Sequence, residues 1–325
     1  MIHADLRRDA LQAWLQQELR GAPFTLTAAS EDASFRRYFR ATLADGASYV
    51  AMDAPPERED CRPFVKVAAL LHQAGVNAPR VLGQDLAQGF LLLTDLGTRT
   101  YLQELNARNA AGLFADATDA LLRWQLATRP GELPPYDEAL LRREMDLFPE
   151  WYVAKHLKKS LSPQQATSLE SIFTLLAKSA LAQPVVYVHR DYMPRNLMVC
   201  EPNPGVLDFQ DAVLGPITYD MVSLVRDAFL SWEEERVLDW AARYWEKARS
   251  KGLPVAADYG EFWRAFEWMG LQRHLKVLGI FARINYRDGK PKYLADTPRF
   301  IQYASSVSQR YRELAPLARL LDELA

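Results

Sequence analysis

The chain has 325 residues, of which 49% are hydrophobic and 25% are charged, and it contains 14 Phe, 14 Tyr and 8 Trp residues. This composition is typical of a globular protein and excludes a disordered or collagen-like chain, and the length exceeds that of one small domain. The 39 Lys and Arg residues nearly balance the 41 Asp and Glu residues, so the formal net charge is −2. The net charge therefore excludes a strongly basic protein built to bind nucleic acid or an anionic membrane.

The N-terminal segment MIHADLRRDALQAWLQQEL mixes charged and apolar residues at helical spacing and lacks the continuous apolar stretch of a signal peptide. No apolar run in the sequence approaches the roughly 20 residues that span a bilayer. The two cysteines, Cys61 and Cys200, are too few for a disulfide framework. We therefore expect a cytoplasmic protein with no nucleic acid, no membrane and no obligate protein partner.

The first 95 residues are predicted to form a sheet with helices. Residues 6–19 place apolar side chains on one helical stripe, and Gly21 ends the stripe. Apolar residues near 64–71 predict a second helix, which Gly75 closes. Alternating runs separated by polar turns predict strands over residues 24–30, 34–43, 48–52, 80–85 and 89–94. An antiparallel sheet with an inserted helix is therefore expected over about residues 24–95.

Beyond residue 97 the pattern becomes mainly helical. Apolar residues recur every three or four positions over about 107–128, 137–158, 163–181, 218–230, 233–250, 259–284 and 296–323. Strand-like runs interrupt the helices at 185–188 and within 197–207. The predicted fold class is α+β, with a small antiparallel lobe over residues 1–96 and a larger, mainly helical lobe over residues 97–325.

Two polar segments follow these strand-like runs, His189–Asn196 (HRDYMPRN) and Leu207–Asp211 (LDFQD). Side chains at the end of a buried strand emerge where a cleft can form. The carboxylate of Asp208 and the amide of Asn196 supply the oxygen ligands that Mg²⁺ prefers. Asp191 is then the candidate for orienting an alcohol and accepting its proton during phosphoryl transfer.

The segment HRDYMPRN resembles the catalytic-loop pattern H-R-D-x-x-x-x-N of the protein-kinase-like superfamily. The stretch LDFQDAVLGPITYD resembles the metal-binding strand and loop of the aminoglycoside phosphotransferase and choline kinase branch, in which an aromatic residue, here Phe209, follows the metal aspartate. The resemblance implies a two-lobed protein-kinase-like fold that uses ATP and Mg²⁺, with the N-terminal lobe covering the nucleotide and the helical lobe carrying the catalytic loop and the acceptor site. It also implies that Asp220 anchors the loop and the following helix.

The resemblance extends to a narrower family. The stretches YVAMDAPPE, FLLLTDLG, REMDLFPEWY, HRDYMPRNLMV, VLDFQDAVLGPITYD and LQRHLKVLGIFARINYRDGKPKYL, between about residues 30 and 300, together resemble bacterial sugar kinases of cell-wall recycling. Members of that family phosphorylate N-acetylmuramate and N-acetylglucosamine at the anomeric carbon. The resemblance therefore implies a small amino sugar as the acceptor and its anomeric hydroxyl as the nucleophile.

The nucleotide contacts that the resemblance implies lie in two places. The turn of residues 30–38, which includes Ser34, would cover the phosphates, and Thr94, Asp95 and Leu96 would form the hinge that meets adenine. The turn contains no glycine, and Met52 or Asp53 stands near the position of the usual strand lysine. Cations suited to phosphate are instead available on the preceding hairpin, at Arg36, Arg37 and Arg40.

The residues expected to contact the acceptor each have a structural explanation as well. They are Glu144, Trp151, Tyr192, Arg195, Gln210, Asp211, His274 and Arg283. Trp151 suits core packing as well as a pyranose face, and Gln210 and Asp211 suit a capped turn as well as sugar hydroxyls. Three arginines are candidates to neutralise the lactyl carboxylate of muramate, Arg226, Arg273 and Arg283, each against a plain salt bridge.

Two alternatives stay open at this stage. The chain could be a phosphotransferase for an aminoglycoside or a choline-like compound, although the HLKVLGIFAR stretch is basic and a polycationic acceptor calls for carboxylates. It could also be a non-catalytic nucleotide-binding regulatory module, since the strand lysine and the glycine-rich loop are missing. The presence of Asp191, Asn196 and Asp208 together favours an enzyme.

Overall fold

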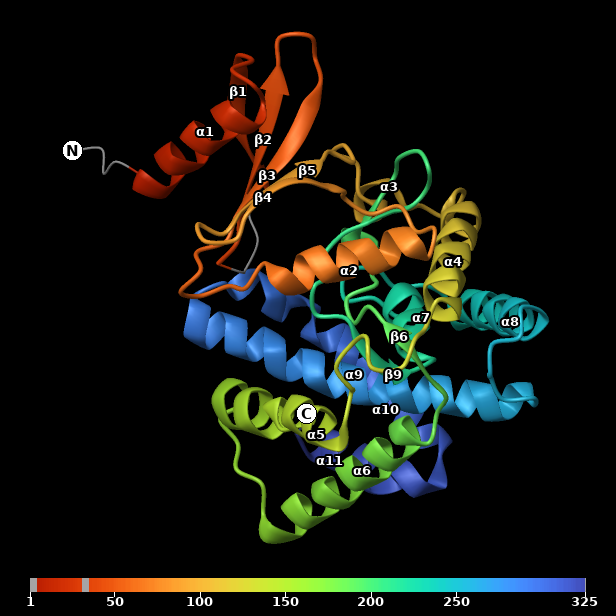
Figure 1. Cartoon of the computed structure of the whole chain (residues 1–325). Helices are drawn as coiled ribbons and strands as arrows, with labels where there is room; N and C mark the ends of the chain where they lie inside the picture. Colours follow the sequence, from red (N-terminus) through yellow and green to blue (C-terminus); the bar gives the residue numbers. More distant parts are fainter. Residues whose placement is uncertain (1–4, 31–34, 325) are drawn as a thin grey trace. The chain divides into compact units, whose positions relative to one another are not determined.

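We describe residues 5–30 and 35–324 of a computed structural model of the chain (Figure 1). The chain packs as two compact units. The first unit contains Met1–Leu105 and Arg195–Asp211, and the second contains Asn106–Pro194 and Ala212–Ala325. The units are defined by packing, and the division into functional lobes at residue 96 stays a prediction.

The first unit is built on a five-stranded sheet with the predicted antiparallel pairing. Its strands are β1 (Phe24–Ser30), β2 (Arg37–Leu43), β3 (Ser48–Asp53), β4 (Val81–Asp85) and β5 (Phe90–Thr94), in the order β1-β2-β3-β5-β4. Helix α2 (Arg62–Gln73) is inserted between β3 and β4. At the turn before β5, Gly89 has φ +75, and a Cβ there would lie 1.8 Å from the Ala54 carbonyl oxygen, so this position requires glycine.

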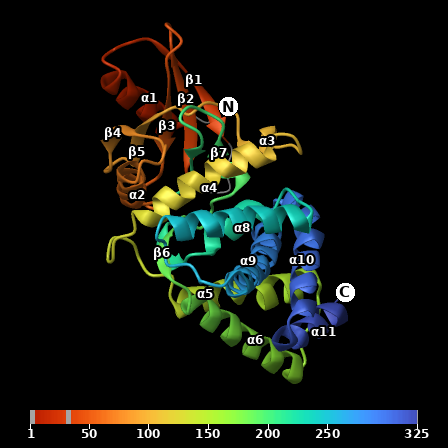
Figure 2. The same cartoon turned by 90° about the vertical axis from the view of Figure 1, so that its right-hand side faces the viewer.

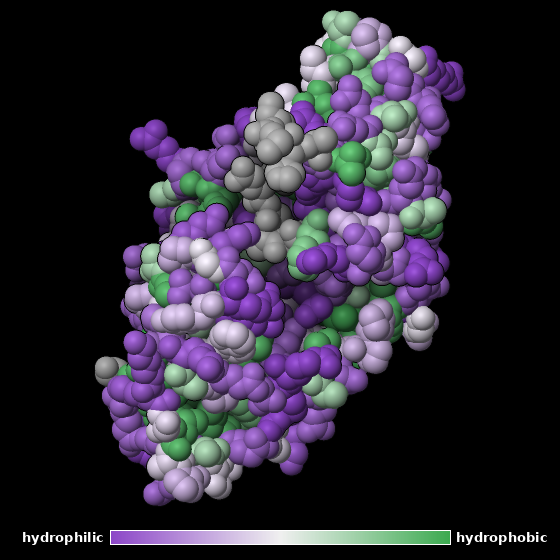
Figure 3. All heavy atoms as spheres, turned by 90° about the vertical axis from the view of Figure 1, so that its left-hand side faces the viewer, coloured by the Kyte–Doolittle hydropathy of each residue, from purple (hydrophilic) through white to green (hydrophobic). Residues whose placement is uncertain are grey.

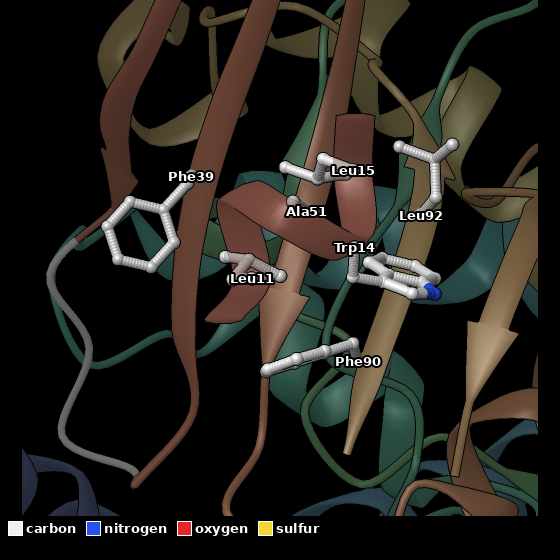
Figure 4. Packing of buried hydrophobic residues seen from close by; sticks show 7 residues of the cluster. All are labelled: Leu11, Trp14, Leu15, Phe39, Ala51, Phe90 and Leu92. Atoms are coloured by element: carbon white, nitrogen blue, oxygen red, sulfur yellow. The ribbon is translucent and has the colours of Figure 1, made fainter. Parts of the chain in front are cut away.

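Helix α1 (Leu6–Glu18) packs on this sheet (Figure 4). Asp5 caps the helix by accepting a hydrogen bond from the Arg8 backbone N–H at 3.1 Å. The hydrophobic cluster consists of Leu11, Trp14 and Leu15 from the helix and Phe39, Ala51, Phe90 and Leu92 from the strands. Each large apolar side chain buried in this way contributes about 1.5–3 kcal/mol, so helix and sheet stabilise each other.

The returning segment of the first unit carries one of the two polar motifs. Strands β7 (Leu197–Met198) and β8 (Gly205–Val206) pair as an antiparallel hairpin after the 3-10 helix η2 (Pro194–Asn196). Isolated bridges join Gly205 to Asn77 and Met198 to Thr100, just before α3 (Tyr101–Glu104). These bridges hold the hairpin against the N-terminal part of the same unit.

The second unit is mainly helical (Figure 2). Helix α9 packs against η1, α6, α7 and α10, and a short antiparallel sheet joins β6 (Val185–Val188) to β9 (Val213–Pro216). The helices are α4 (Ala110–Leu126), α5 (Glu138–Met145), the π-helix η1 (Phe148–His156), α6 (Pro163–Leu181), α7 (Tyr219–Val225), α8 (Glu234–Ser250), α9 (Tyr259–Asp288), η3 (Pro291–Asp296), α10 (Thr297–Arg310), η4 (Arg312–Leu314) and α11 (Ala315–Leu324).

Two segments were predicted as single long helices, and this prediction is wrong because each is divided into shorter helices. The helix predicted over 137–158 is α5 followed by η1, where Pro149 at the start of η1 has no backbone N–H to continue a regular helix. The helix predicted over 296–323 is α10 and α11, separated by η4. Tyr311 between them has extended backbone (φ −116, ψ 126), and Pro316 lies in the first turn of α11. Apolar spacing continued through both breaks and therefore did not reveal them.

The exposed hydrophobic side chains of the described residues are dispersed over the surface. On the face drawn in Figure 3, hydrophilic residues predominate and hydrophobic ones are interspersed among them. The large exposed hydrophobic side chains, such as Leu82, Leu126 and Val185, are spread along the chain, which is ordinary for a globular protein. No helix within residues 5–30 and 35–324 is long and apolar enough to cross a bilayer.

Candidate active site

The loop that carries Asp191 leaves the buried strand β6 and is held by Asp220 at the start of α7. The Asp220 carboxylate accepts hydrogen bonds from the backbone N–H groups of His189 at 2.7 Å and Arg190 at 3.0 Å. The anchoring role predicted for Asp220 is therefore confirmed. Burial raises the pKa of Asp220 to about 7, although both backbone hydrogen bonds lower it. Arg190 has φ +75, a backbone conformation that costs energy for a non-glycine residue and that is concentrated at functional sites.

Further contacts fix the backbone around Asp191. Its N–H donates to Nδ1 of His189 at 3.2 Å, and the His189 ring meets the Tyr192 ring edge-on at 5.6 Å. The Tyr192 hydroxyl donates to the Ala117 carbonyl oxygen at 2.8 Å. His189 and Tyr192 thus brace the loop, and the Asp191 side chain stays half-buried rather than enclosed.

Glu144 lies at the centre of a buried ionic network in the second unit. Its Oε1 is 2.5 Å from Nη2 of Arg190 and 2.9 Å from Nζ of Lys276, and its Oε2 accepts a hydrogen bond from the Tyr136 hydroxyl. Burial alone would raise the pKa of Glu144, but the charges of Lys276 and Arg190 lower it to about 2. Glu144 is therefore ionised and connects α5 and α9 to the loop that carries Arg190.

Replacing Glu144 by Gln is expected to destabilise the fold by about 3–5 kcal/mol at pH 7, because it leaves two buried cations without their carboxylate. The folded pKa of about 2 lies below the unfolded value of about 4.3. The stabilisation is therefore present above about pH 4 and is lost as the pH falls toward 2. Denaturant unfolding from pH 7 to pH 3 should show the gap between wild type and variant narrowing on acidification.

The matched control is Glu170→Gln, which removes an exposed carboxylate paired with Arg142 and should cost less than about 1 kcal/mol. Equal stability of wild type and Glu144→Gln at pH 7, or a gap that widens on acidification, would contradict the proposed role of the network.

Asn196 and Asp208 lie together in the first unit. Nδ2 of Asn196 is 3.3 Å from Oδ2 of Asp208, and Nε2 of Gln210 donates to Oδ1 of Asp208 at 2.9 Å. Asp208 has φ +61, so it shares with Arg190 the positive backbone angle that is rare outside glycine. These contacts hold the Asp208 carboxylate in place beside an amide.

Both residues line a cavity of about 270 Å³ in the first unit. Three of the predicted nucleotide-binding residues, Thr94, Asp95 and Leu96, line the same cavity, as does Arg195. The remaining lining includes apolar side chains such as those of Val50, Leu93, Met198 and Leu207. An apolar slot with a few fixed polar groups at one side suits a flat heteroaromatic base with a charged tail.

The donor set of this cavity fits Mg²⁺. Asp208 supplies carboxylate oxygens and Asn196 an amide oxygen once its side chain is turned, and Mg²⁺ in phosphotransferases is bound by one or two such groups while it keeps several waters. No cluster of three or more His, Cys, Asp or Glu side chains able to hold a metal occurs among the described residues. The described residues therefore contain no His, Cys, Asp and Glu cluster that would hold a transition metal. The two oxygen donors, Asp208 and Asn196, suit Mg²⁺ instead.

The three arginines proposed to replace the strand lysine have different surroundings. Arg40 lines the cavity, and its guanidinium bridges Asp95 at 2.5 and 3.0 Å and the Gly97 carbonyl at 2.8 Å. Arg36 pairs with Glu59, and Arg37 pairs with Asp5 and with the buried Asp53. Ser34 lies outside the described residues. A phosphate role for Arg36, Arg37 and Arg40 stays a prediction, and Arg40 holds Asp95 and the Gly97 carbonyl in place.

The structure places the other predicted acceptor residues in several environments. Trp151 lies half-buried on η1, and Asp211 is exposed at the end of the returning segment. His274 is fully buried in α9, with its ring stacked on Tyr303 at 5.0 Å. Arg283 lies nine residues further along the same helix, and its Nε has no hydrogen-bond partner within the described ranges. Their contact with an acceptor stays a prediction.

Sequence reasoning missed several residues that shape these sites. Tyr136 and Tyr219 enclose the Glu144 network, with their rings 5.4 Å apart and edge-on. The sequence predicted Arg40 only as a ligand of phosphate. The one available signal for Lys276 was a charged residue among the apolar residues of α9, since a buried lysine is rarely tolerated without a carboxylate partner.

A small antiparallel sheet unit, a helical unit and an H-R-D-x-x-x-x-N loop anchored by a following aspartate define a phosphotransferase of the protein-kinase-like fold. Comparisons with known proteins support this assignment of the fold and the enzyme class. The family model described as "Phosphotransferase enzyme family" matches residues 25–262. A choline/ethanolamine kinase family protein from Mesorhizobium loti has a TM-score of 0.64 at 15% identity, covering 96% of this chain and 99% of its own. An ADP-bound aminoglycoside phosphotransferase has a TM-score of 0.61 at 14% identity, covering 92% and 98%.

Curated relatives are more similar in sequence. The N-acetylmuramate/N-acetylglucosamine kinase of Pseudomonas putida is 54% identical over 334 residues, covering all of this chain and 98% of the relative. The protein of the same name from Neisseria meningitidis is 52% identical, covering 98% and 96%. The chain therefore belongs to the phosphotransferase enzyme family, within the group that contains these kinases. The predicted fold class, the predicted enzyme class and the family resemblance are confirmed.

Proposed function

We propose that the protein transfers the γ-phosphoryl group of ATP to the anomeric hydroxyl of N-acetylmuramate or N-acetylglucosamine in the cytoplasm. The observation that carries this proposal is the H-R-D-x-x-x-x-N loop with its Asp220 anchor in a chain more than 50% identical to kinases named for those two sugars. The helical unit and the Asn196–Asp208 pair support a phosphotransferase over a purely regulatory nucleotide-binding module.

Each residue has a distinct role in the proposed reaction. Asp191 orients the anomeric hydroxyl and takes its proton as the new oxygen–phosphorus bond forms, and ADP leaves with the electrons of the broken bond. An anomeric hydroxyl is more acidic than an ordinary alcohol, so an aspartate of ordinary basicity suffices. Asn196 and Asp208 would hold Mg²⁺, which when bound offsets charge on the phosphate oxygens. Thr94, Asp95 and Leu96 would receive the adenine.

A coupled assay of ADP release with a panel of acceptors tests this function. Turnover with N-acetylmuramate and N-acetylglucosamine, and at most trace turnover with an aminoglycoside or choline, is the expected result. Turnover confined to an aminoglycoside or choline would replace the sugar assignment with the second phosphotransferase class. ATP binding without turnover on any acceptor would favour a regulatory module.

A further inference from the structure

Lys276 is a buried lysine in the middle of α9, with 8% of its surface exposed. Its Nζ lies 2.9 Å from Oε1 of Glu144 and donates to the Tyr219 hydroxyl at 3.1 Å. A lysine is rarely buried unless its charge is paired, because taking an ammonium group out of water is costly. The two partners hold this ammonium at a fixed point inside the second unit.

Glu144 connects Lys276 to the residue before Asp191. The same Oε1 that faces Lys276 is 2.5 Å from Nη2 of Arg190, and Arg190 immediately precedes Asp191. Arg190 has φ +75, which persists in a residue with a side chain only where the surroundings hold it. The ion pair with Glu144 therefore supports the backbone turn from which the Asp191 side chain projects.

Tyr219 connects Lys276 to the anchor of the catalytic loop. Tyr219 immediately precedes Asp220 at the start of α7, and its hydroxyl accepts the hydrogen bond of the Lys276 ammonium. The Asp220 carboxylate in turn accepts the backbone N–H groups of His189 and Arg190. The contact with Lys276 therefore fixes the residue beside the anchor, so that one lysine supports the loop along two separate routes.

Lys276 attracts the carboxylate of Asp191 as well as that of Glu144. Arg190 and Lys276 bring two positive charges to the one carboxylate of Glu144. Burial alone would lower the pKa of Lys276, but Tyr219 and the negative charges of Glu144 and Asp191 raise it. Lys276 is therefore charged, and its charge draws the Asp191 carboxylate toward the interior of the second unit.

A glycine in α9 sets the approach that brings Lys276 to Glu144. A Cβ at Gly279 would lie 2.3 Å from the backbone carbonyl carbon of Leu147, closer than real Cβ atoms come. Gly279 follows Lys276 by three residues, and Leu147 follows Glu144 by three residues. Residues three apart lie on the same face of a helix, so this close contact places the lysine and the carboxylate side by side.

We propose that Lys276 is a positioning residue that holds Asp191 in the orientation required for phosphoryl transfer. It acts through Glu144 on the turn before Asp191, and through Tyr219 on the anchor of the loop. Lys276 does not line the cavity of the first unit, so we expect it to affect the chemical step and not the binding of Mg·ATP. The inference rests on the proposed function, because it explains how the proposed base is kept in place.

Removing the ammonium group of Lys276 tests this role. In Lys276→Met the ion pair between Glu144 and Arg190 remains, so the fold should be retained. We expect kcat with N-acetylglucosamine to fall roughly 10- to 100-fold, and the KM values for sugar and ATP to stay within about twofold of wild type, because a misplaced catalytic group slows the chemical step. Tyr219→Phe, which removes only the hydroxyl, should lower kcat about threefold with the same KM values.

The same substitution in the Asp191→Asn background separates positioning from a structural effect. Asp191→Asn already lacks the base, so Lys276→Met should lower its residual kcat by less than about twofold. An equal fold-loss in both backgrounds overturns the inference, as does a raised KM with unchanged kcat. If Lys276→Met does not fold, Tyr219→Phe in both backgrounds decides by the same criterion. The control is Lys247→Met, which removes a lysine paired with Asp119 and should leave kcat unchanged in both backgrounds.

The outcomes separate this inference from the proposed function. A wild type active on the sugars, with kcat unchanged in Lys276→Met and Tyr219→Phe, overturns the positioning role and leaves the function intact. A wild type inactive on both sugars overturns the function, and hydrogen exchange then tests the positioning role without turnover. The backbone N–H groups of residues 189–191 should exchange at least about threefold faster in both variants than in wild type, with α4 as the internal reference. Equal exchange in this loop overturns the positioning role.

Discussion

Replacing Asp191 by Asn is expected to lower kcat by roughly 10²–10⁴-fold while Mg·ATP binds as in wild type. The amide has the shape of the carboxylate but cannot accept the proton of the anomeric hydroxyl. The fold should be preserved, because the backbone N–H groups of His189 and Arg190 donate to the Asp220 carboxylate and hold the loop in both proteins. Steady-state kinetics with N-acetylglucosamine, together with calorimetric titration of Mg·ATP, measures both parts of this expectation.

Asp239→Asn is the matched control for that experiment, because Asp239 is exposed on α8 and pairs only locally with Arg243 among the contacts described. It should retain wild-type kcat. A value of kcat near wild type in Asp191→Asn would remove Asp191 from the role of general base.

Replacing Asp208 by Ala is expected to abolish the metal dependence of nucleotide binding. Asp208 supplies the carboxylate beside Asn196 in the cavity of the first unit. Asp95, the other carboxylate lining that cavity in the described residues, is engaged by Arg40. The variant therefore has no carboxylate there that can take over the metal. Titration of ATP with Mg²⁺ and with EDTA should show tight, Mg²⁺-dependent binding for wild type and equal, weak binding in both conditions for the variant.

Asp60→Ala removes an exposed carboxylate of the same unit that is paired with Arg62, and it should keep the wild-type dependence on Mg²⁺. The thermal midpoint of each variant checks that the unit is folded. Unchanged Mg·ATP affinity in Asp208→Ala would contradict a metal-binding role for this residue.

Local patterns were sufficient to predict most of the secondary structure. The apolar and β-branched runs between polar turns in residues 24–94 predicted the five strands, which pair antiparallel in the structure. The two polar motifs were likewise visible, since residues as close as Asp191 and Asn196 form a recognisable pattern in one short segment.

Contacts between distant segments could not be predicted in this way. The return of residues 195–211 to the first unit depends on bridges to Asn77 and Thr100, more than 95 residues earlier in the chain. Strand β9 was missed because four residues that include Gly215 and Pro216 carry almost no β signal of their own. One cavity of the second unit is lined by residues within 226–237 and 302–310, and no spacing rule joins these segments.

Glu144 is a single residue whose contacts with distant segments could not be predicted from the sequence. Sequence reasoning could propose that Glu144 meets an acceptor, because a polar residue in an amphipathic helix often faces a cleft. It could not show that Arg190, Lys276 and Tyr136 all converge on its carboxylate. The partners come from three separate elements, so only the folded chain reveals that they form one network.

The central claim is the transfer of a phosphoryl group to the anomeric oxygen of an amino sugar. Phosphorus NMR of the product formed from N-acetylglucosamine, ATP and Mg²⁺ tests it most directly. We predict one new phosphomonoester signal coupled to the anomeric proton, in an amount equal to the ADP released. A phosphoester coupled to any other sugar proton, or ADP formed with inorganic phosphate alone, would contradict the account.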